Sequence, residues 1–137
     1  MKRELSEKLM KDFPQLFQAK DLPNTESLMC YGIGVRDGWE PLLRKLCEDI
    51  MALPDLSPEV RFDQIKEKLG RLTVYTNNTD KRANELCVAA LKASQSVCEI
   101  CGTTYDVGLT DTAWKKTLCV DCHFSGRRYR RSWEEDD

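Results

Sequence analysis

Apolar residues recur every three or four positions in three segments, a pattern that predicts amphipathic helices. These segments are 4–13, 38–53 and 80–96. The middle one has the broadest stripe, so we expect it to form the centre of the core. Its apolar residues are Trp39, Leu42, Leu43, Leu46, Cys47, Ile50 and Met51. Asp37 and Thr79 can accept hydrogen bonds from the first amides of the second and third helices, which makes them the expected N-caps.

The remainder of the N-terminal part is expected to contain loops, one further helix and little sheet. Segment 14–38 is rich in glycine and polar residues and predicts a loop, with a short extended piece at 28–33. Segment 57–69 has the spacing of a helix, which Gly70 would end in a left-handed conformation. The residues at that helical spacing are Phe62, Ile65 and Leu69. Apolar and polar residues then alternate over 72–76, the clearest strand pattern in the chain.

Composition narrows the class of protein. A chain of 137 residues, 41% apolar and 32% charged, is expected to fold as one soluble unit. The formal net charge is -2, so any attraction for nucleic acid or anionic lipid must be local. No apolar run approaches the roughly eighteen residues that a membrane span needs, and the charged N-terminus does not resemble a signal peptide. We therefore expect a cytoplasmic protein with reduced cysteines.

Two cysteine pairs near the C-terminus predict a metal site. Their spacing is C-x2-C-x17-C-x2-C, which is typical of structural zinc in zinc ribbons and treble clefs. The expected ligands are Cys98, Cys101, Cys119 and Cys122. Four thiolates fill the coordination shell of one Zn²⁺ and leave no position for a reactive water, so we expect a non-enzymatic protein. His123 is the only histidine and could replace one cysteine, but four thiolates already suffice.

The predicted fold is therefore α+β and mainly helical. It comprises a helical core with a short strand or hairpin (1–96), a cysteine module (97–126) packed on the helix at 80–96, and a tail (127–137). Inside the cysteine module we expect an apolar patch over the metal that includes Trp114, with an exposed Trp114 that recognises a partner as the alternative. The other members of that patch are Tyr105, Val107 and Leu109. Cys47 and Cys87 fall on apolar helix faces, where cysteine acts as a small hydrophobe.

The tail contains the one dense basic patch of the sequence, followed at once by four acidic residues. Arginines interleaved with aromatics contact phosphates and stack on bases, but the same residues also anchor protein interfaces. The candidate binding residues are Arg127, Arg128, Tyr129, Arg130, Arg131 and Trp133. Nucleic acid and protein both remain open as partners of this patch.

Three stretches resemble small uncharacterised bacteriophage and prophage proteins: "LPNTESLMCYGIGVRDGWEPLLRKLCEDI", "QIKEKLGRLTVY" and "CEICG…W…TLCVDC". The resemblance implies a phage accessory protein in a bacterial host cell, and we expect it to bind and modulate a host protein of defence or gene expression. Nucleic-acid binding through the cysteine module and the arginines is the alternative. The cysteine pairs also resemble the zinc frame of HNH-type nucleases. Because no histidine lies between the pairs, the catalytic residues of that family have no counterparts here.

Overall fold

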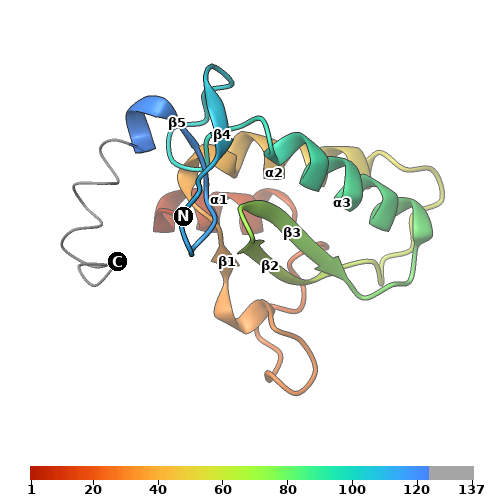
Figure 1. Ribbon diagram of the computed structural model, residues 1–137. Coiled ribbons are helices and arrows are strands. Elements are labelled where there is room, and N and C mark those ends of the chain that lie inside the picture. Colours follow the sequence, from red (N-terminus) through yellow and green to blue (C-terminus); the bar gives the residue numbers. More distant parts are fainter. Residues whose placement is uncertain (124–137) are drawn as a thin grey trace.

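The computed structural model describes residues 1–123 and folds them into helices and two small sheets (Figure 1). The α-helices are α1 (Arg3–Asp12), α2 (Glu40–Met51) and α3 (Lys81–Ser94). Two one-turn 3-10 helices are η1 (Met29–Tyr31) and η2 (Asp37–Trp39). The three predicted helical segments and the mixed α/β class are thus confirmed. Within residues 1–123 no helix is long and apolar enough to cross a membrane.

The larger sheet has three strands in the order β1–β2–β3. Its strands are β1 (Ile33–Gly34), β2 (Phe62–Lys68) and β3 (Arg71–Thr76). β1 pairs with β2 in parallel, and β2 and β3 form an antiparallel hairpin. The smaller sheet is an antiparallel hairpin within the cysteine module, formed by β4 (Val107–Leu109) and β5 (Thr117–Cys119).

The helix predicted over 57–69 is wrong, because most of this segment forms strand β2. Phe62 and Ile65 are three residues apart and both buried, a spacing that is typical of a helix and not of a regular strand. The pairing of β2 with β3 is shifted between Phe62 and Gln64, and this bulge adds one residue to the strand. The extra residue reverses the alternation, so that both side chains face the core.

The turn between β2 and β3 also explains Gly70. This residue was expected to end a helix, but it forms a two-residue hairpin turn with Leu69. Both residues have positive φ, 54° at Leu69 and 79° at Gly70, as a type I′ turn requires. The predicted left-handed conformation is therefore correct and its context is not.

Both predicted N-caps are wrong. The Asp37 carboxylate does not cap α2 and instead accepts a 2.7 Å hydrogen bond from the Lys2 amide, which holds the N-terminus against η2. α3 is capped by Asp80, whose carboxylate accepts from the Arg82 amide at 2.9 Å. The extended piece expected at 28–33 is mainly η1 followed by β1.

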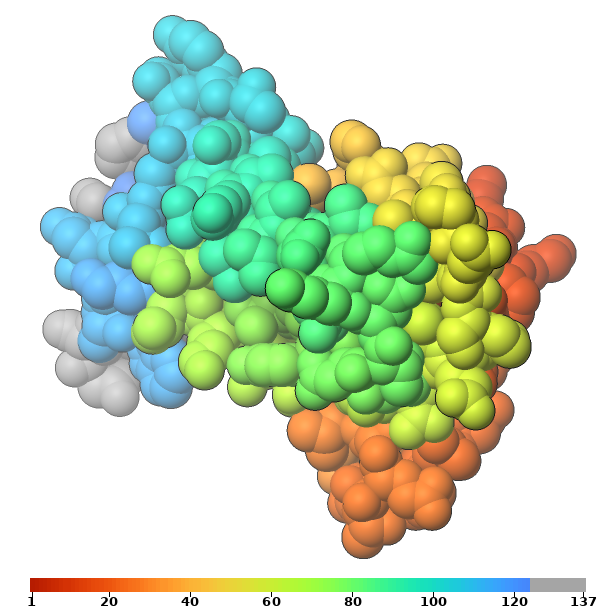
Figure 2. Space-filling view, turned by 90° about the vertical axis from the view of Figure 1, so that its right-hand side faces the viewer, coloured from red at the N-terminus to blue at the C-terminus, as the bar shows by residue number. Residues whose placement is uncertain are grey.

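The core lies between the larger sheet and the α-helices. Phe17 and Phe62 meet edge to face at 5.4 Å between their ring centroids. α2 and α3 lie side by side, and α3 covers the outer edge of β3, where Ser94 Oγ accepts a 3.0 Å hydrogen bond from the Leu72 amide (Figure 1). α3 also crosses one face of the molecule, with the cysteine module at one end (Figure 2). Cys47 of α2 and Cys87 of α3 are buried, as expected.

Candidate metal centre

The first cysteine pair lies in a tight turn that directly follows α3. The Gly102 amide donates to the Cys98 carbonyl and the Cys98 amide to the Thr103 carbonyl, each at 2.9 Å. Gly102 has φ +80°, a conformation that glycine adopts without steric cost. These bonds fold the chain back on itself and turn the Cys98 and Cys101 thiols to the same side.

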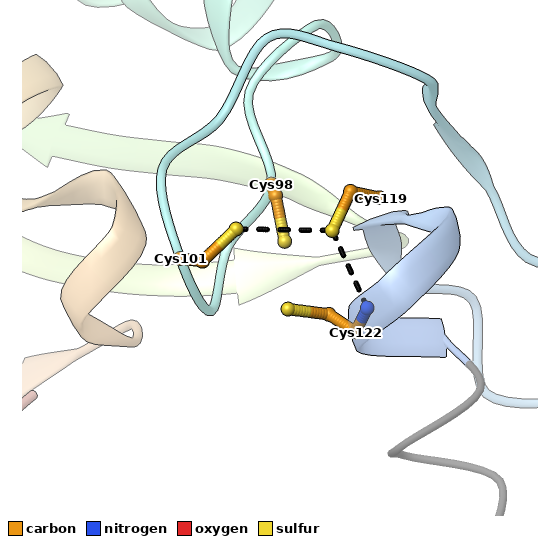
Figure 3. A group of neighbouring side chains, drawn as sticks. All are labelled: Cys98, Cys101, Cys119 and Cys122. Carbon is orange, nitrogen blue, oxygen red and sulfur yellow. Dashed lines mark hydrogen bonds between the residues drawn. The ribbon is translucent and has the colours of Figure 1, made fainter.

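The second cysteine pair lies where β5 passes into a helical turn. Cys119 is the last residue of β5, and residues 120–123 form that turn, which carries Cys122. The Cys122 amide donates to Cys119 Sγ at 3.3 Å. A tight turn, a hairpin and a helical turn thus surround one point, toward which all four thiols are directed (Figure 3).

The spacing of the four sulfur atoms fits one metal ion. All four Sγ atoms lie within 4.8 Å of one another, and Cys101 Sγ and Cys119 Sγ are 3.7 Å apart. Sulfurs around tetrahedral zinc are about 3.8 Å apart, because the zinc–sulfur bond is about 2.3 Å long. A disulfide would bring two sulfurs to about 2.05 Å, so the cluster is not a disulfide pair. One ion of a thiophilic metal can bind here, and zinc is the usual choice of four thiolates.

The pKa values of the clustered thiols indicate what a bound cation would do. Burial raises the pKa of Cys98, but the backbone amides of Cys101, Cys119 and Ile100 donate to its sulfur and lower the pKa to about 7. Burial raises the pKa of Cys122, and hydrogen bonds with the other three thiols raise it further. One thiolate therefore forms readily and opposes the next. A bound cation would stabilise all four.

Gly38 forms the first contact site between the cysteine module and the core, here called the first seat. Its amide donates to the Glu99 carbonyl at 2.7 Å, and a Cβ at this position would lie 2.2 Å from the Cys98 carbonyl oxygen. The neighbouring indole of Trp39 is held at the same contact, because its Nε1 donates to the Val97 carbonyl at 2.8 Å. The 3-10 helix η2, which directly precedes α2, therefore touches the turn that carries the first cysteine pair.

The β2–β3 turn provides the second seat. Lys116 forms an ion pair with Glu67, and Thr117 Oγ1 donates to the Gly70 carbonyl. Glu67 also accepts a 2.8 Å hydrogen bond from the Gly70 amide. We expected the helix at 80–96 to carry the cysteine module. These bonds run instead to η2 and to the turn of the larger sheet.

Glu99 is a buried carboxylate between the two seats. It is 2% exposed, and its Oε2 accepts a 3.3 Å hydrogen bond from the Arg36 amide. Burial raises the pKa of Glu99, and the nearby Lys116 partly offsets this. Its Oε1 has no hydrogen-bond partner within residues 1–123. The sequence alone does not indicate that Glu99 is buried, because this residue lies between Cys98 and Cys101 without any apolar pattern around it.

The predicted apolar patch over the metal is wrong. Tyr105, Leu109 and Trp114 are 78%, 56% and 68% exposed, so their side chains face solvent and do not form a core. The β4–β5 hairpin, which carries Leu109 and Trp114, also borders an open depression of about 550 Å³. Its lining includes Val107, Leu118, Val120 and His123. With three residues per strand, the small sheet has too little area to bury these side chains on itself.

The other predicted site residues are only partly located. His123 lines the depression and is not a member of the four-thiol cluster. The predicted binding residues Arg127–Arg131 and Trp133 lie outside the described residues. No protein-family model matches the chain, and no curated protein and no solved structure is significantly similar to it. The resemblance to phage proteins therefore stays a prediction.

Proposed function

We propose that this protein is a non-enzymatic zinc-binding protein that engages a host protein, as a phage accessory factor acting on a defence or gene-expression component. The bacterial context comes from the resembling stretches of sequence. In this proposal the zinc ion is structural. It fixes the cysteine module, and the module presents a surface to the partner.

The exposed Trp114 carries the proposal. It lies in the loop between β4 and β5, and its carbonyl accepts a 2.9 Å hydrogen bond from Thr112 Oγ1. The Thr110 and Thr112 hydroxyls are joined at 3.0 Å, and Thr110 also accepts from the Lys116 amide at 3.0 Å. The indole is thus exposed on an organised loop. Tryptophan and tyrosine on such a surface are the residues that most often contribute strongly to protein binding.

The donor set of the metal centre supports a non-catalytic role. Four thiolates complete the tetrahedron, which leaves no open position for substrate or water. The chain has one histidine, and it lies after both cysteine pairs. The HNH chemistry requires a histidine between the pairs, so the frame that resembles this nuclease family lacks the means to activate water.

A binding experiment tests the proposal. We expect the tagged full-length protein to retain a bacterial protein from lysate, and the purified pair to form a stoichiometric complex with one zinc per chain. Trp114→Ala should abolish or strongly weaken this complex, because truncating a central interface tryptophan typically costs about 2 kcal/mol or more. Nuclease treatment should leave the complex intact.

Tyr31→Ala is the matched control. Tyr31 is 71% exposed, similar to Trp114, but it belongs to η1 and not to the cysteine module. This variant should bind like the unchanged protein. Equal loss in both variants, or a complex that depends on nucleic acid, would contradict the assignment of the surface around Trp114.

A further inference from the structure

One face of the larger sheet is open and carries no acidic side chain. Alternation along β2 and β3 places the apolar residues Ile65, Leu72 and Val74 against the core. The opposite face, here called the open sheet face, consists of Gln64, Lys66, Lys68, Arg71, Thr73 and Tyr75. The two acids of β2 do not contribute to it as free charges, since Asp63 pairs with Arg61 and Glu67 with Lys116.

The cations of the open sheet face have no acidic partner among residues 1–123. Lys68 and Arg71 are exposed and lie directly opposite each other in the hairpin register. Lys66 is half-buried and lies two residues before Lys68 on the same face. Like charges placed opposite each other destabilise an antiparallel pair. The pairing of Lys68 with Arg71 does not stabilise the fold, whereas an anionic ligand would neutralise both charges.

Tyr75 supplies a flat apolar surface beside these charges. Its ring is 41% exposed, and Lys66 Nζ lies 5.9 Å from the ring centroid. The strand neighbours of Lys66 are small: Gly34 on one side and Thr73 on the other. A Cβ at Gly34 would lie 3.0 Å from the Ile65 carbonyl oxygen, so a larger residue fits poorly there. No bulky side chain therefore rises from the sheet beside Lys66. The Lys66 ammonium lies over the tyrosine ring, and this flexible side chain can turn to a phosphate when a planar group stacks there.

We propose that the open sheet face binds single-stranded nucleic acid. Phosphates would lie along Lys66, Lys68 and Arg71, and a base would stack on Tyr75. Residues two apart on a strand are separated by about 6.8 Å, which is comparable to the spacing of successive phosphates in an extended single strand. Cations that follow the backbone together with an aromatic platform are the common means of binding single strands without sequence preference.

The arrangement favours a polynucleotide over an acidic protein segment. An acidic peptide needs only the cations, while Tyr75 beside Lys66 adds a partner for a planar ring. The protein as a whole has a net charge of -2, so attraction is confined to this face and to the arginines of the tail. The site is independent of Trp114 and goes beyond the protein-binding role proposed above.

Fluorescence anisotropy with a fluorescein-labelled oligouridine, at several salt concentrations, tests the proposal on the zinc-loaded full chain. The combined variant K66A/K68A/R71A should weaken binding tenfold or more. Because each phosphate contact with a single strand contributes roughly 0.7 to the slope of log K against log salt, the slope should fall in magnitude by about 2. Tyr75→Ala should weaken binding roughly tenfold, while Tyr75→Phe, which keeps the stacking ring, should not.

The combined variant K8A/K11A/K92A is the matched control. It removes the same charge from exposed lysines of α1 and α3 and leaves the tail arginines in place, so it should bind almost normally. Far-UV circular dichroism checks that both triple variants fold. Equal loss in the two triple variants, no binding by the unchanged protein at low salt, or equally good displacement of the oligonucleotide by polyglutamate would overturn the proposal.

Discussion

Gly38 shows how one missing side chain joins the cysteine module to the core. We expect Gly38→Ala to lower the free energy of unfolding by about 3 kcal/mol, as overpacking at a rigid contact does. The added Cβ would lie 2.2 Å from the Cys98 carbonyl oxygen and 2.5 Å from backbone atoms of Glu99, and neither can rotate away. Urea unfolding followed by circular dichroism measures the change.

Gly108→Ala is the control for this variant. A Cβ at Gly108 has no atom within 4 Å, although the residue belongs to the same cysteine module. Its free energy of unfolding should be close to that of the unchanged protein. Similar midpoints for the two variants would show that the contact at Gly38 does not hold the module.

The buried thiol of Cys87 predicts a dependence of stability on pH. Burial raises the pKa of Cys87 to about 12, whereas an unfolded thiol has a pKa of about 8.5. Its stabilising contribution is complete below pH 8.5 and is lost as the pH rises toward 12, because only the unfolded state ionises there. The free energy of unfolding should fall more steeply than in Cys87→Ala, by up to about 1.4 kcal/mol per pH unit.

Urea unfolding of both proteins across this alkaline range provides the measurement. The two should respond alike between neutral pH and about 8.5, where the thiol is protonated in both states. Parallel curves at higher pH would mean that Cys87 is already reactive in the folded protein. Labelling by a thiol reagent distinguishes this, because exposed Cys30 should react first and Cys87 only on unfolding.

The β2–β3 hairpin contains a turn that its sequence does not favour. Leu69 has φ 54° and is 62% exposed, so it adopts a left-handed conformation without burying its side chain. That conformation costs a residue of this kind roughly 1–2 kcal/mol. Leu69→Asn creates the Asn-Gly pair preferred in type I′ turns and should raise the free energy of unfolding by about 1 kcal/mol.

Thermal unfolding of Leu69→Asn and Leu69→Ala separates the effect of the backbone conformation from the effect of removing an exposed apolar side chain. Both remove the exposed leucine, but alanine has no preference for the left-handed region and should give little gain. If both variants are stabilised equally, the benefit comes from removing apolar surface and the turn is not strained.

At the level of the complete chain, the two seats couple the metal centre to the core. We expect the unchanged protein to contain one zinc per chain and Cys98→Ser to lose it, since structural zinc contributes on the order of 10 kcal/mol of folding free energy. Removal of the metal by a chelator should then detach the module. Amide exchange at Gly38, which donates to the Glu99 carbonyl, should accelerate, while exchange at Phe62, which donates to Leu16, should stay slow.

Cys30→Ser is the control for the loss of zinc. Cys30 is exposed and lies outside the four-thiol cluster, so this variant should keep the metal and the slow exchange at Gly38. Slow exchange at Gly38 in Cys98→Ser would show that the hydrogen bonds of the two seats hold the module without metal.

The sequence alone determined the four cysteines that cluster, the three α-helices and strand β3, because each is marked by the spacing of residue types along the chain. It did not determine strand β2, since the bulge between Phe62 and Gln64 reverses the alternation and imitates helical spacing. Nor did it show that Trp114 is exposed or that Gly38 and Glu99 meet, because exposure and contact depend on segments about sixty residues apart in the chain. The tertiary structure decided which surfaces are free, and therefore where binding is to be tested.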